Sequence, residues 1–99
     1  MKKELTLKEY VIPNNKLISW REIDNEIVFL HKEERAFYEL NETANFIWKE
    51  AVRGQKIEEI IEAMQKKFLG INKEILRKDT LNFISNLLKK KIYLLKNEC

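Results

Sequence analysis

The spacing of apolar residues changes at Asn41, and this change constrains the fold more than any other feature of the chain. Before it, the segment 35–40 alternates between its two sides, as a strand with one buried face does. After it, apolar residues recur three and four positions apart, which is typical of one face of a helix; these are Ala44, Ile47, Trp48 and Ala51. Strands come first and helices second, so the sequence predicts an α+β fold.

The region before Asn41 predicts a three-stranded antiparallel meander. Its apolar runs are rich in β-branched and aromatic residues. Asp24 and Asn25 tolerate the positive φ of a hairpin turn, and Glu33 with Glu34 turns the chain again. We expect the outer edge of the third strand to be open, because the chain leads directly from it into the helices and no further strand is predicted beside it. The strands are expected at residues 16–24, 26–32 and 35–40.

Capping signals predict three helices after the strands. The side chains of Asn41 and Asn72 can each accept a hydrogen bond from an unpaired backbone amide at the start of a helix. Gly54 and Gly70 can each end a helix. The second helix carries apolar residues between 57 and 68, the third covers about 73–91, and the apolar tail 92–95 forms a final strand or packs on the core. Residues 1–15 show no period, so we treat them as an N-terminal arm preceding one domain over residues 16–95.

Composition limits the classes of function. A chain of 99 residues fits one domain, and 35% charged residues indicate a water-exposed surface. The formal net charge of +3 tolerates an acidic peptide or a nucleic acid and requires neither. Cys99 is the one cysteine, so no internal disulfide forms and we expect a cytoplasmic setting; we read Cys99 itself as inert. No run of about 18 apolar residues exists, so we expect no membrane-spanning helix.

The third helix is more apolar than a helix that covers one side of a core. Its apolar residues span an arc of about 160°, whereas a core-facing stripe needs about 100°. The surplus edge carries Leu81, Ile84 and Leu88. Either the tail or the N-terminal arm packs on this edge, or it forms a groove with the open third strand. Such a groove would accept an extended peptide as an added strand.

Three stretches in series resemble the PqqD-like family over about residues 16–95. Residues 37–48, FYELNETANFIW, resemble its y-x-L-N-x-t-a-x-x-i-w stretch. Residues 57–68 look like its x-x-e-e-i…f helix, and residues 79–87, DTLNFISNL, resemble its d-v-x-x-f-l-x-x-L helix. The chain departs from the family in turn positions, where the family often has Gly, Thr and Gly; these are Glu33 with Glu34, Lys56 and Lys91.

The resemblance implies a winged helix-turn-helix with a three-stranded N-terminal sheet. It implies a protein without catalytic activity that captures the leader segment of a ribosomally made precursor peptide. A modifying or processing enzyme would then act on that peptide: a radical SAM enzyme, a leader protease or another tailoring enzyme. The leader would add to the third strand and lie against the third helix. Carried over, the contacts are Arg35, Ala36, Phe37, Tyr38 and Glu39 on the strand, and Lys78, Leu81, Asn82, Ser85 and Leu88 on the helix.

Other sites and functions receive less support. Asp79 matches an acidic position of the family, and we favour a structural ion pair or hydrogen bond for it. His31 has no Cys or His cluster beside it, so we expect no metal site, and nothing points to a cofactor or a catalytic group. The alternative is a winged-helix DNA-binding regulator, which the weak net charge disfavours. A third reading is a structural subunit without affinity for peptide.

Overall fold

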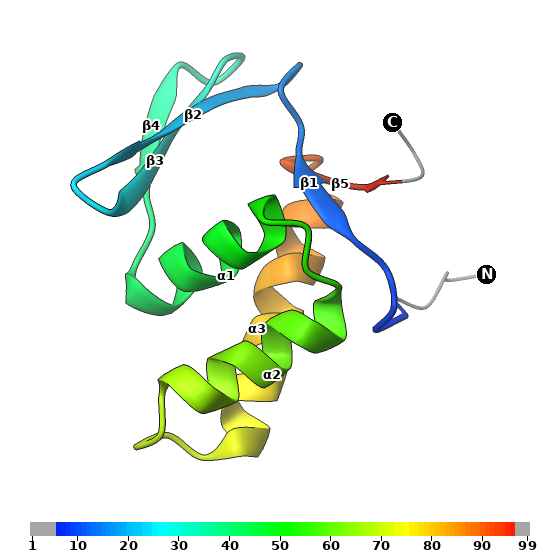
Figure 1. Ribbon diagram of the computed structural model, residues 1–99. Coiled ribbons are helices and arrows are strands. Elements are labelled where there is room, and N and C mark those ends of the chain that lie inside the picture. The colour runs from blue at the N-terminus through cyan, green and yellow to red at the C-terminus, as the bar shows by residue number, and fades with distance from the viewer. Residues whose placement is uncertain (1–5, 97–99) are drawn as a thin grey trace.

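The fold consists of two antiparallel sheets and three helices, with the main sheet before the helices, as the change of spacing at Asn41 predicts (Figure 1). The computed structural model describes residues 6–96, so Cys99 and the start of the predicted arm lie outside the described residues. The elements are β1 (Val11–Pro13), β2 (Ile18–Ile23), β3 (Glu26–His31), β4 (Ala36–Glu39), α1 (Glu42–Val52), α2 (Ile57–Lys67), α3 (Lys73–Lys89) and β5 (Tyr93–Leu95).

Strands β2, β3 and β4 form the predicted meander in that order. Asp24 and Asn25 adopt φ values of 51° and 69°, which is the geometry of a tight hairpin turn between β2 and β3. The third strand is shorter than predicted. Arg35 belongs to the preceding turn, since its φ is 56° and its amide donates to the His31 carbonyl at 2.7 Å.

A second sheet, which the sequence analysis did not predict, corrects the expectation of a single three-stranded sheet. Strand β1 pairs with β5, with Val11 opposite Leu95. The predicted apolar tail 92–95 therefore forms a strand, which was one of its two expected structures. Part of the predicted arm, residues 1–15, packs into the fold, where Val11 is fully buried. Strands of three residues are too short to show a hydrophobic period, and their pairing depends on contacts between distant parts of the chain.

Two of the predicted caps have the expected geometry. The Asn41 side chain accepts from the Ala44 amide at 2.9 Å, and the Asn72 side chain accepts from the Glu74 amide at 2.8 Å. Gly54 follows α1 with a φ of 92°, as a helix-ending glycine does. The prediction for Gly70 is wrong, because α2 already ends at Lys67.

Phe68 explains this early end of α2. Its backbone leaves the helical region, with φ −107° and ψ 69°, and its ring packs edge-on against Phe46 of α1, with the ring centroids 5.8 Å apart. The contact fixes the end of α2 against α1 and makes a left-handed glycine unnecessary. Gly70 accordingly is not among the residues with positive φ.

The surplus apolar edge of α3 is not the open surface that the groove hypothesis needed. Ile84 is fully buried, and Leu81 and Leu88 are partly buried against the core. Strand β5 packs against α3, as expected if the tail of the chain lies on this helix. The apolar arc of α3 is wide because the helix contacts both its helical neighbours and the second sheet.

A column of five aromatic rings runs through the protein and joins the sheet to the helices. Trp48 of α1 is fully buried and stacks on Phe29 of β3, with the ring centroids 5.4 Å apart. On one side Phe29 stacks on Tyr38 of β4 at 5.0 Å, and on the other Trp48 contacts Tyr93 of β5 at 5.1 Å. Tyr93 in turn meets Phe83 of α3 edge-on at 6.2 Å. The column thus fixes β4 relative to α3.

Asn45 of α1 joins the helix to the sheet through hydrogen bonds. Its buried side-chain oxygen accepts from the Ile27 amide of β3, and its side-chain nitrogen donates to the Leu40 carbonyl at 2.9 Å. Leu40 is the residue where the chain leaves β4 for α1. Asn45 therefore holds the corner between β4 and α1.

Replacing Asn45 with Ala should lower the free energy of unfolding by about 2 kcal/mol, because the buried Ile27 amide then lacks an acceptor. Urea denaturation followed by circular dichroism measures the change. The exposed Glu62→Ala variant is the control and should stay within about 0.5 kcal/mol of the native chain. An equal, small effect of both variants would contradict the role given to Asn45.

Candidate functional site

The outer edge of β4 is unpaired within the described chain, since β4 ends the order β2-β3-β4. The Leu40 amide donates to the Ile27 carbonyl, so the alternation of an antiparallel ladder turns the amides of Tyr38 and Ala36 toward β3 as well. The amides and carbonyls of Phe37 and Glu39 then point outward. They are the groups to which a further strand can bind.

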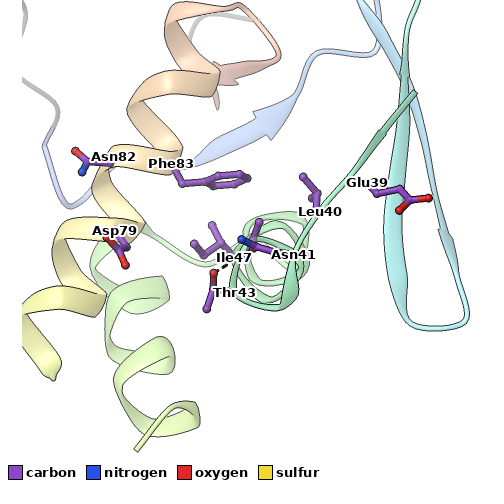
Figure 2. Close-up of a pocket in the computed structure, with 9 residues that line it drawn as sticks. Glu39, Leu40, Asn41, Thr43, Ile47, Asp79, Asn82 and Phe83 are labelled. Atoms are coloured by element: carbon purple, nitrogen blue, oxygen red, sulfur yellow. Dashed lines mark hydrogen bonds between the residues drawn. The ribbon is translucent and has the colours of Figure 1, made fainter. Parts of the chain in front are cut away.

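Two hollows lie between this edge and α3, and together we call them the groove. The Asp79 hollow holds about 380 Å³ and lies at the end of β4, over α1 (Figure 2). Its lining comprises Glu39, Leu40, Asn41, Thr43, Ala44, Ile47, Asp79, Asn82 and Phe83. The Lys90 hollow holds about 350 Å³ and lies beside the start of β4. Its lining comprises Phe29, His31, Glu34, Tyr38, Glu39, Leu40, Leu87, Lys90 and Ile92.

The side chains of the Asp79 hollow give it an apolar floor and a charged rim. In Figure 2, Phe83 extends from α3 toward Leu40, and Ile47 of α1 lies below them. Asp79 lies on the α3 side of the hollow, whereas the Glu39 side chain points away from the hollow. The hollow thus suits an apolar side chain, with a carboxylate at its helix side.

Polar contacts fix the wall of the Lys90 hollow. The Tyr38 hydroxyl donates to a carboxylate oxygen of Glu34, and the Glu34 amide donates to Nδ1 of His31 at 3.2 Å. The hydrogen bond to Glu34 raises the pKa of the Tyr38 phenol above its ordinary value, and partial desolvation and the Glu34 charge raise it further. The phenol is therefore a hydrogen-bond donor at neutral pH, and its ring is held on Phe29.

The predicted contact residues divide between the groove and other surfaces. Tyr38, Glu39 and Asn82 line the groove. The Phe37 side chain is 76% exposed and lines a hollow on the opposite face of the sheet, so only its backbone faces the groove edge. The remaining predicted residues lie in the turn before β4, within β4, or around the other sides of α3: Arg35, Ala36, Lys78, Leu81, Ser85 and Leu88.

The groove wall of α3 is a stripe that the sequence analysis did not select. It comprises Asp79, Phe83 and Leu87 of α3 together with Lys90, which directly follows the helix and keeps a helical backbone, at the spacing of one helix face. Leu81 and Leu88 lie about half a turn away from this stripe, at 100° per residue. The i, i+4 spacing of Phe83 and Leu87 is a signal for this stripe, but the same spacing is typical of a helix face that packs on the core. Asp79 shows no side-chain hydrogen bond or ion pair within residues 6–96, contrary to the structural role we favoured.

The described chain offers little for other chemistry. Across residues 6–96, no group of three or more His, Cys, Asp or Glu side chains is arranged to hold a metal ion. In the same range, no helix is long and apolar enough to cross a membrane.

Comparison with known proteins places this geometry in a family context. The family model described as coenzyme PQQ synthesis protein D (PqqD) matches residues 26–92. A solved structure with a similar fold is TbiB1 in complex with the TbiA(beta) leader peptide. It aligns with a TM-score of 0.70 and 22% identity, over 86% of this chain and 94% of that chain. Among curated proteins, none matches this chain significantly.

Hydrogen exchange should distinguish the two sides of β4. We expect the amides of Phe37 and Glu39 to exchange with solvent much faster than the amide of Tyr38, because only the Tyr38 amide points to β3. Exchange rates from two-dimensional NMR of the free chain test this. Protection of the Phe37 and Glu39 amides equal to that of Tyr38 would mean that the edge is already occupied.

Proposed function

The chain belongs to the PqqD family, and from that premise we propose that it binds the leader segment of a ribosomally made precursor peptide. The match covers residues 26–92, which include β3, β4 and all three helices, and therefore both walls of the groove. The observation that carries the proposal is the open edge of β4 beside two apolar hollows.

The leader adds to β4 as a fourth strand. The outward amides and carbonyls of Phe37 and Glu39 bind its backbone, which supplies affinity independently of the leader sequence. Every second side chain of an added strand points toward α3. TbiB1, which has a similar fold, was solved in complex with a leader peptide, and this supports leader binding by the present chain.

The inward side chains of the leader enter the two hollows. In the Lys90 hollow they meet Tyr38 and Leu87, and in the Asp79 hollow they meet Leu40 and Phe83. Of the contacts expected from the sequence, we retain Phe37 and Glu39 through their backbone, Tyr38 through its ring, and Asn82 at the rim. The strand edge and apolar burial supply affinity, and the side chains that enter the hollows set the register.

Holding the leader would serve a separate enzyme. We assign no chemistry to this chain: it raises the effective concentration of the precursor at a radical SAM enzyme, a leader protease or another tailoring enzyme. The groove fits this task because it binds only a short extended segment. The rest of the precursor stays free to reach the active site of the partner.

DNA binding is the alternative, if the three helices with the β1–β5 ribbon act as a winged helix-turn-helix. Arg77 and Lys78 on α3 would then contact phosphates, but Glu74 and Asp79 lie on the same helix and would repel them. Because acidic residues interrupt the basic ones and the net charge is only +3, we favour a peptide over DNA. Steep salt dependence on duplex DNA, with no leader binding, would reverse this preference.

A pair of substitutions at Phe37 should separate its backbone from its side chain. Phe37→Pro removes an outward amide without removing a bond to β3, so it should weaken leader binding about tenfold or more. Phe37→Ala keeps the amide and should bind almost as the native chain does, because this side chain lies on the far face. The probe is the leader encoded beside the gene of this chain, titrated by calorimetry.

Circular dichroism should be native for both variants, which checks that the fold is intact. Equal binding by the proline and alanine variants would exclude strand addition at β4. No saturable binding of the leader by the native chain at micromolar concentration would exclude the proposed function and favour a structural subunit.

A further inference from the structure

The groove-facing stripe of α3 is charged only at its two ends. Asp79 lies at one end and Lys90 at the other, with Phe83 and Leu87 between them. Within residues 6–96 neither charged side chain has a hydrogen bond or an ion pair. Each borders an apolar hollow, where a bound peptide would displace water and strengthen a charge contact.

The two charges point in nearly the same direction. They are eleven positions apart, which is about three turns of helix, so their side chains project from one side of α3. The distance along the axis is about 16 Å. An extended peptide covers that distance in about five residues.

Other charges on the groove modify this pattern without cancelling it. Glu39 borders both hollows, but its side chain points away from the Asp79 hollow (Figure 2). Glu34 borders the Lys90 hollow and accepts a hydrogen bond from the Tyr38 hydroxyl. It makes no ion pair with Lys90. Since neither carboxylate is paired with Lys90, Lys90 stays available to an acidic side chain of the leader.

We propose that Asp79 and Lys90 select the order of charges along the leader that lies in the groove. The bound segment carries a basic side chain opposite Asp79 and an acidic side chain opposite Lys90. We take the leader to be antiparallel to β4, as β3 is. The Asp79 hollow adjoins the end of β4, and the Lys90 hollow reaches back to Glu34 in the turn before it, so this strand runs from Asp79 toward Lys90. The basic residue therefore precedes the acidic residue by about five positions, with apolar residues between them. This inference rests on the proposed function.

The charges matter because the other contacts of the groove do not distinguish one charge order from the other. Backbone hydrogen bonds form with any sequence, and apolar hollows accept the same apolar side chains in both cases. Opposite charges at the two ends of the groove favour a leader with the matching order over one with the reverse order.

The test uses a displayed library of random peptides long enough to span the groove, selected on the full chain. Peptides lost on the Phe37→Pro variant are the groove binders. Among them we expect Lys or Arg about five residues before Asp or Glu. On the charge-exchanged variant Asp79→Lys with Lys90→Asp, the order of the two charges should be reversed.

A single selected peptide gives the quantitative form of the test. Exchanging its two charges should weaken binding to the native chain about tenfold, and the charge-exchanged variant should restore it. The matched control, Glu74→Lys with Lys89→Asp, makes the same exchange at exposed positions of α3 that do not line the groove. It should leave the preference for the native order unchanged.

Two results would overturn the inference. If groove binders show no charge order, or the same order on the native and charge-exchanged chains, Asp79 and Lys90 do not select the charge order, while the proposed function stands. If no peptide depends on the Phe37 amide, strand addition itself fails, and the inference fails with it.

Discussion

The stack of Trp48 on Phe29 is the contact on which the rest of the structure depends. Trp48 belongs to α1 and Phe29 to the central strand β3, so this stack attaches the sheet to the helices. Through Tyr38 on one side and Tyr93 with Phe83 on the other, it reaches both walls of the groove. Each aromatic pair contributes about 1 kcal/mol beyond the area it buries. The separation of β4 and α3 is therefore a property of the core.

This arrangement explains how a small protein keeps a strand edge open without losing stability. On one side β4 is hydrogen-bonded to β3, and its Tyr38 ring packs in the aromatic column. Asn45 fixes the corner where the chain passes from β4 to α1. The other side of β4 keeps its backbone groups for a ligand. An open edge invites nonspecific pairing, and the exposed charges beside it, Glu34, Glu39 and Lys90, oppose that pairing.

Local signals predicted most of the fold, and long-range contacts account for what they missed. The helix caps at Asn41 and Asn72 and the hairpin at Asp24 depend on a few neighbouring residues, so the sequence predicted them. The β1–β5 pair joins segments from opposite ends of the chain and left no local signal. The groove stripe of α3 was not predicted because the spacing of Phe83 is that of a core residue. The Phe83 ring has both roles, since it contacts buried Tyr93 and also lines the Asp79 hollow.

The most direct measurement is the NMR structure of the chain with its leader bound. The account predicts contacts between the leader backbone and the amides of Phe37 and Glu39, together with new protection of these two amides from hydrogen exchange. A leader that instead contacts the free edge of β2, or the exposed side of α3 around Ile75, would contradict it.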